Sequence, residues 1–289
     1  MSVWKLFFPC VVLLVGCAGK AQDSTGVGNP GLTQTEQALY DDGDESRRAS
    51  DVASAITAIP HLALSDPKQI DTPDGAASVG EFGRLAFTPK DCVSTSRAAN
   101  VVTFTFTDCT YTLGYTKVNG KLLATYAAGP SAGTATLKIA SENLSLEVYD
   151  RNLNPLVVKL DVVADAKIAF GPTSKTVEWN GTYTGTAPSF TLTHRPSFRS
   201  TRITTDSSSC VTVDGKASDT IEGRTLTADV SGYKRCGASR ACPEAGGKVT
   251  FTAADGVRFV TIEFLGGRNT RVTLPDRSFE TDKLLKCSG

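Results

Sequence analysis

The stretch LVVKLDVVADAKIAF, residues 156–170, decides the fold class of this chain. Its even-numbered positions are all apolar, from Leu156 to Phe170, and most of the positions between them are charged. Because successive side chains of a strand point to opposite faces, this alternation predicts a long antiparallel strand with one buried face and one wet face. An unbroken strand of this length would reach about 50 Å, so we expect a bulge or bend near Ala164 and Asp165.

The segments on either side repeat this alternation. NVVTFTFT (100–107) and NLSLEVYD (143–150) also place apolar side chains on one face. Pairs typical of hairpin turns separate several β-prone runs: Asn119-Gly120, Glu222-Gly223, Asp255-Gly256 and Gly266-Gly267. Residues 80–289 are therefore expected to form a mainly β domain, folded as an antiparallel meander, a sandwich or a partly open barrel.

The N-terminal part of the chain has a different character. Apolar residues at helical spacing ahead of Pro60 predict one short amphipathic helix over 45–59, within a connecting segment that extends to residue 79. Residues 17–44 are small, polar and rich in glycine, without apolar periodicity. Such a composition cannot bury enough apolar surface to fold, which predicts a flexible tether.

Residues 1–16 have the features of a secretory signal peptide, because Lys5 precedes an apolar run too short to cross a bilayer as a helix. The run ends at a cysteine, and Leu14-Val15-Gly16-Cys17 resembles the lipobox of bacterial lipoproteins. The resemblance covers only this leader. It implies that a peptidase cuts before Cys17 and that lipid on its thiol anchors the protein to a membrane. The alternative is ordinary cleavage after Ala21, which would release a secreted protein without an anchor.

The same resemblance indicates which membrane holds the anchor. Ala18 stands where an aspartate retains some lipoproteins in the inner membrane of Gram-negative bacteria, so the family pattern favours the outer membrane. The body of the chain resembles uncharacterised β-rich lipoproteins of the bacterial envelope and no characterised family. The expected partners are the membrane, through the anchor, and an envelope protein or glycan.

Six cysteines follow Cys17, and an even number in an exported chain predicts disulfides: Cys92, Cys109, Cys210, Cys236, Cys242 and Cys287. A metal or other cofactor is not expected, because no Cys-x-x-Cys pair is present and histidines are few. A two-residue turn at Glu222-Gly223 would bring Cys210 within one residue of Cys236, and a single bulge would close that gap. The preferred bridges are Cys210–Cys236, Cys92–Cys109 and Cys242–Cys287. Cys236–Cys242 with Cys210–Cys287 is the alternative.

Composition and motifs argue against several classes of function. The 30 acidic and 30 basic side chains cancel, whereas a nucleic-acid-binding protein needs a positive surface. No motif of a serine hydrolase, a P-loop protein or a zinc protease is present, and His61 and His194 are interpreted as surface or capping residues. Four strand carboxylates are expected to be wet-face charges opposite basic residues rather than a catalytic pair: Asp161, Asp165, Glu178 and Glu263. No catalytic residue is therefore predicted.

One segment is suited to ligand binding. HRPSFRSTR gathers Arg195, Arg199 and Arg202 around Phe198, a combination that could hold an anionic or sugar ligand. The alternative is an edge or loop whose charges block unwanted strand pairing. Trp179 falls in phase with apolar neighbours and is expected in the core.

Taken together, these features predict a lipid-anchored, non-enzymatic envelope protein with a structural or binding role. One alternative is a periplasmic carrier that holds an apolar ligand on the even-numbered face of 156–170. Another is an anchored carbohydrate-active enzyme, which would need two carboxylates about 5–10 Å apart in an open cleft.

Overall fold

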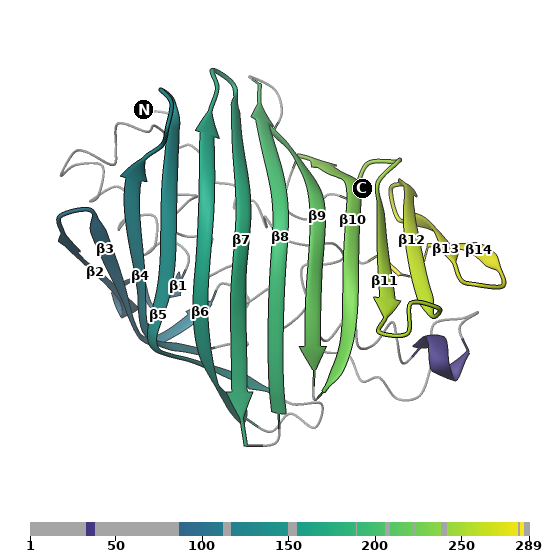
Figure 1. Cartoon of the computed structure of the whole chain (residues 1–289), viewed down its shortest axis with the longest axis horizontal. Helices are drawn as coiled ribbons and strands as arrows, with labels where there is room; N and C mark the ends of the chain where they lie inside the picture. The colour runs from purple at the N-terminus through teal and green to yellow at the C-terminus, as the bar shows by residue number, and fades with distance from the viewer. Residues whose placement is uncertain are drawn as a thin grey trace.

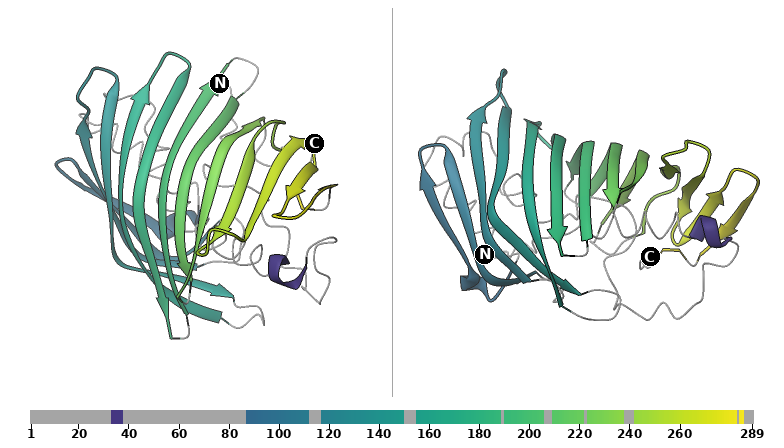
Figure 2. Two further views of the ribbon diagram at one scale, coloured as in Figure 1. Left: turned by 45° about the vertical axis from the view of Figure 1, so that its right-hand side comes forward. Right: turned by 60° about the horizontal axis from the view of Figure 1, so that its bottom comes forward.

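The computed structural model describes residues 33–37, 87–111, 117–149, 155–188, 190–205, 209–221, 223–237, 242–282 and 284–285. Their main feature is one 14-stranded sheet in which every pairing is antiparallel. From β3 to β14, strands adjacent in sequence are adjacent in the sheet, which is open rather than closed (Figure 1). The sheet curves across its width (Figure 2). The predicted mainly β fold is confirmed, in its meander form.

The first edge of the sheet is an interrupted strand. β1 (Phe87–Thr88) and β2 (Val93–Ala98) both pair with β3, and a short 3-10 helix, η2 (Lys90–Cys92), lies between them. The other strands are β3 (Val101–Tyr111), β4 (Lys117–Ala128), β5 (Thr134–Tyr149), β6 (Pro155–Phe170), β7 (Ser174–Ala187), β8 (Phe190–Thr204), β9 (Ser209–Ile221), β10 (Arg224–Cys236), β11 (Lys248–Ala253), β12 (Phe259–Gly266), β13 (Asn269–Thr273) and β14 (Ser278–Thr281).

Strand β6 carries the alternation that opened the sequence analysis. Its even positions from Val158 to Ile168 are 1–8% exposed, and their odd-numbered neighbours are exposed. Of the bulge or bend expected near Ala164 and Asp165, the bulge is a wrong prediction for β6, because β6 pairs with β7 in one register throughout. The irregularity lies in the other neighbour, β5, where the register shifts between Ala140 and Ser145.

A side chain holds this β5 bulge in place. The hydroxyl of Ser141 accepts a hydrogen bond from the backbone N–H of Val162 (2.8 Å) and donates one to the carbonyl of Leu160 (3.1 Å). The hydroxyl thus takes the place of backbone groups that the bulge removes from the ladder. β6 therefore keeps a single register with β7, and the extra residue is taken up in β5.

The bulge also changes which positions of β5 face the core. Ile139 is buried before it and Leu144 after it, an odd-to-even switch, and β3 makes the corresponding even-to-odd switch between Phe106 and Cys109. Since side chains alternate along a strand, one extra residue is what allows both halves of a bent strand to bury apolar groups. Gly120 of β4 lies between the two irregularities.

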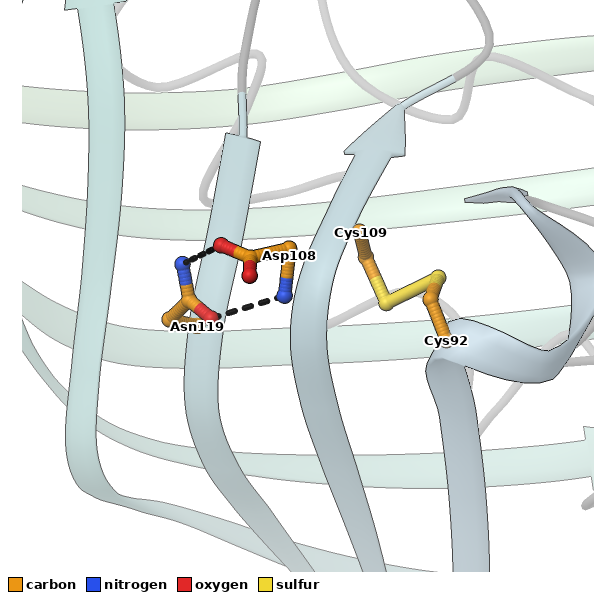
Figure 3. The surroundings of a disulfide bond; sticks show 4 residues. All are labelled: Cys92, Asp108, Cys109 and Asn119. Carbon is orange, nitrogen blue, oxygen red and sulfur yellow. Dashed lines mark hydrogen bonds between the residues drawn. A yellow bond between two sulfur atoms is a disulfide. The ribbon is translucent and has the colours of Figure 1, made fainter.

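The Asn119-Gly120 pair is therefore part of β4 and not a hairpin turn, so that turn prediction is wrong. Gly120 has φ +109°, and a Cβ at this position would lie 2.2 Å from the carbonyl oxygen of Asn143. The Asn119 side chain accepts a hydrogen bond from the backbone N–H of Asp108 (2.7 Å) and donates one to its carboxylate (3.2 Å), as Figure 3 shows. The same residue types suit a hairpin turn and this bulge because both need a positive φ.

The other three hairpin predictions are confirmed, and one of them fixes a disulfide. Ile221 faces Arg224 across the two-residue turn, and a bulge in the middle of β10 then brings Cys236 opposite Cys210, 4.0 Å away between Cα atoms. This is the register argument made from the sequence, with its single bulge. The pair is bonded, which excludes the alternative that joined Cys236 to Cys242.

A second disulfide joins the interrupted edge strand to its neighbour. Cys92 of η2 is bonded to Cys109 of β3, with 5.2 Å between the Cα atoms (Figure 3). Cys242 is disulfide-bonded as well, and its expected partner Cys287 lies outside the described residues. Because disulfides persist in oxidising compartments and are rare in the cytosol, they indicate an exported protein.

A short helical turn over 34–37 is described within the segment expected to be a flexible tether. The Glu36 carboxylate accepts a hydrogen bond from the backbone N–H of Thr33 (2.7 Å), a capping-box contact, and one from the Arg277 guanidinium (2.5 Å). The signal peptide 1–16, Cys17 and the predicted helix 45–59 lie outside the described residues. In the part of the chain that the structure describes, no helix has the length and apolar character needed to span a bilayer.

Candidate functional site

The predicted ligand-binding cluster of β8 is divided between the two faces of the sheet. Phe198 is 7% exposed in the core and Arg202 lies on the same face, half-buried, whereas Arg195 and Arg199 are exposed on the other. Alternation along a strand makes this division unavoidable once β8 continues through the whole segment. The four side chains therefore do not converge on one ligand.

On the buried face, Arg202 meets a cation that sequence reasoning missed. Lys175 of β7 is its direct cross-strand partner, and the Lys175 ammonium lies 5.6 Å from the centre of the Phe170 ring. The Nε–H of Arg202 donates a hydrogen bond to the Ser209 hydroxyl (2.9 Å). Burial and the neighbouring Arg202 lower the pKa of Lys175 to about 7, and burial lowers the pKa of Arg202.

A second polar group lies further along the same face. Nδ1 of His194 (β8) and a carboxylate oxygen of Asp219 (β9) are 2.5 Å apart, and both residues are 2% exposed. The two residues are direct cross-strand partners. The interpretation of His194 as a surface or capping residue is therefore wrong. Two residues further on, Pro196 also lies inside β8, even though it has no N–H to donate.

Two aromatic residues of β7 extend this group. The Tyr183 ring stacks on the His194 ring with centroids 5.6 Å apart, and the indole N–H of Trp179 donates to the Tyr183 hydroxyl (2.7 Å). Trp179 packs against the core, as expected from its phase. The result is a row of polar and aromatic groups across three strands on the buried face of the sheet.

The His194–Asp219 pair resembles two members of a hydrolytic triad, but none of the described residues completes the triad. Nε2 of His194 is buried and receives no hydrogen bond from, and makes none to, any described residue. The next hydroxyl on this face of β8 is Ser200, which lies six residues, or about 20 Å, along the strand. The arrangement can orient an imidazole, but no described residue is bonded to its Nε2 as a nucleophile would be.

The strand carboxylates lie where the sequence placed them, on the exposed face. By register, Asp165 lies opposite Lys138 and Glu178 opposite Lys167. Asp161 lies opposite Thr184 of β7, so the basic partner expected for it is not found there. Glu263 forms an ion pair with Arg271 (3.1 Å). None of the described residues form a group of three or more side chains suited to holding a metal.

The chain matches no family model, and neither a curated protein nor a solved structure is significantly similar to it.

Proposed function

We propose that this protein is an exported bacterial lipoprotein, anchored through Cys17 and acting without catalysis as a structural or binding component of the outer membrane. The observation that carries the proposal is the pair of disulfides, Cys92–Cys109 and Cys210–Cys236, in a body that follows a lipobox-like leader. The disulfides place the body in an oxidising compartment, and the leader would provide both the export and the anchor.

The contact between Glu36 and Arg277 would limit the distance between the β domain and the membrane. From Cys17 to Thr33 the chain makes 16 steps, which span at most roughly 55 Å when fully extended. The turn between β13 and β14, which holds Arg277, would then stay within that distance of the lipid. The exposed face of the sheet would be available to a partner in the envelope, either a protein or a glycan.

The two alternative functions receive less support. An open carrier groove needs the even-numbered face of β6 to be accessible, and its residues from Val158 to Ile168 are at most 8% exposed. A glycosidase needs two carboxylates facing one cleft, whereas Asp165, Glu178 and Glu263 each lie opposite a basic residue.

Replacing Cys17 by serine tests the proposal. In a Gram-negative host fed with labelled palmitate, the wild-type protein should carry the label and sediment with outer membranes. Cys17→Ser should lose both properties. Cys10→Ser is the matched control, because it removes a leader cysteine outside the lipobox-like segment and should leave labelling unchanged. Equal labelling of wild type and Cys17→Ser would refute anchoring at this thiol.

A further inference from the structure

The buried face of β8–β14 is covered, although the described part of this region is a single layer of strands. Two valines on the exposed face of β6 show how little neighbouring strands alone cover a side chain, since Val163 is 65% exposed and Val157 is 55% exposed. On the buried face, valines of β9 to β13 are only 1–4% exposed: Val213, Val230, Val249, Val260 and Val272. A second layer must therefore pack on this face.

The described residues do not supply this second layer. The buried apolar residues of β1–β7 pack together in one cluster, and most of those of β8–β14 form a separate one. Among the described residues outside the strands, the second cluster includes only Leu274, Leu284 and Leu285. The exposed fractions are those of one chain alone, so the covering layer comes from other residues of the same chain.

Residues 38–86 are the internal segment that is long enough to form this layer. They number 49, whereas the other internal segments outside the described residues have five residues or fewer. The described residues on either side of 38–86 lie at opposite edges of the sheet. Before it, Glu36 accepts a hydrogen bond from Arg277 in the turn between β13 and β14, and after it comes β1 (Figure 2).

Between Gln37 and Phe87 the chain must therefore cross the width of the sheet. The strand order from β14 to β1 has 12 steps, which correspond to about 58 Å at the usual spacing of strands. The 50 steps of chain from Gln37 to Phe87 could span about 165 Å when extended, so the segment has length to fold on the way. The exposed face stays exposed along β6, β8 and β10, which leaves the buried face for the crossing.

The sequence of the segment suits a covering layer. The helix predicted over 45–59 carries its apolar residues on one side: Ala49, Val52, Ala53, Ile56 and Ile59. Nine steps of chain separate Glu36 from Glu45, at most roughly 32 Å, so the predicted helix begins within that distance of the contact with Arg277. This limit corresponds to about six strand spacings and keeps the start of the helix over β8–β14.

We propose that residues 38–86 cross the buried face of the sheet from the β13–β14 turn to β1, and that the apolar side of the predicted helix over 45–59 packs on β9–β13. An amphipathic helix on an apolar sheet face completes a two-layer core. The exposed face is then the face that the sheet offers to a partner. This inference needs neither the lipid nor the leader, so it stands apart from the proposed anchoring.

Site-specific photo-crosslinking in the full mature chain tests the placement of the segment. With p-benzoylphenylalanine in place of Ile56, crosslinks should form within the chain to buried-face residues such as Val213 and Val249. Ser54 is the matched control position, because it lies on the opposite side of the predicted helix and its crosslinks should miss these residues. Crosslinks from position 56 to exposed-face residues such as Thr227, to a second copy, or to none of the strands would overturn the proposal.

Urea unfolding provides a second readout, the contribution of the contact to stability. Ile56→Asp and Val52→Asp each place a charge in the proposed apolar contact, so each should lower the urea midpoint by about 1 M. Ser54→Asp adds the same charge on the opposite side of the predicted helix and should leave the midpoint unchanged. Equal midpoints for the wild type and all three variants, or an equal drop in all three, would contradict packing through this side of the helix.

Discussion

Replacing His194 by leucine and Asp219 by alanine, singly and together, tests whether the two residues act as one buried unit. Leucine approximates the volume of the imidazole but leaves the Asp219 carboxyl group, 2% exposed, without the single hydrogen bond that the described residues give it. Removing one partner of a buried pair costs about 3–5 kcal/mol, because the other must stay desolvated or take up a proton. His194→Leu should therefore lose that amount of unfolding free energy at pH 7.

The two backgrounds are expected to differ in whether Asp219→Ala lowers or raises the free energy of unfolding. Asp219→Ala should destabilise the wild-type protein, because it leaves both ring nitrogens of His194 unpaired in the core. In the His194→Leu background, Asp219→Ala should instead raise the free energy of unfolding by at least about 1 kcal/mol, since it removes the buried carboxyl group that has lost its partner. Urea unfolding followed by Trp179 fluorescence measures this directly, because the other tryptophan, Trp4, lies in the proposed leader. Equal destabilisation by Asp219→Ala in both backgrounds would refute the coupling.

Three further outcomes follow from the fold. Ser141→Ala should cost about 2–3 kcal/mol in urea unfolding, because it leaves two part-buried backbone groups of β6 unpaired, whereas Ser145→Ala should change little; equal effects would contradict the assigned role. The double replacement Cys210→Ser and Cys236→Ser should lose about 3.5 kcal/mol, from the entropy of closing a loop with a separation of 26 residues, and a loss under about 1 kcal/mol would show that the bridge adds little. The pKa of Lys175 is lowered from 10.5 to about 7, so between these pH values the unfolded chain binds more protons and the free energy of unfolding rises with pH. Lys175→Gln should make this rise less steep. An unchanged slope would refute the assignment of the pH dependence to Lys175.

The sequence was most informative where one strand could be interpreted alone. The alternation in 156–170 predicted β6 and both of its faces, because a side-chain period of two depends only on the strand itself. The position of the bulge depends on the neighbour, since β5 could absorb the extra residue through Ser141 and leave β6 regular. Asn119-Gly120 was misread for a related reason, because a positive φ is compatible with a turn and with a bulge.

The candidate sites also differ in whether their contacts could be predicted from one segment of the sequence or depend on the alignment of neighbouring strands. Cys210–Cys236 could be predicted because a two-residue turn fixes the register of a hairpin, and one bulge completed the pairing. The His194–Asp219 pair depends on the register between β8 and β9, and a proline within a sequence, here Pro196, argues against a central strand. Lys175 could not be paired with Arg202 from the sequence, because their contact needs β7 and β8 aligned over their full length.

The intact mass of the mature protein, extracted in detergent from a Gram-negative host, tests the central account most directly. The account predicts a chain that begins at Cys17, carries lipid on that residue and is lighter by about two protons for each disulfide, with all six downstream cysteines oxidised. A chain that begins elsewhere with an unmodified Cys17 thiol, or one with Cys92, Cys109, Cys210 and Cys236 reduced, would contradict it.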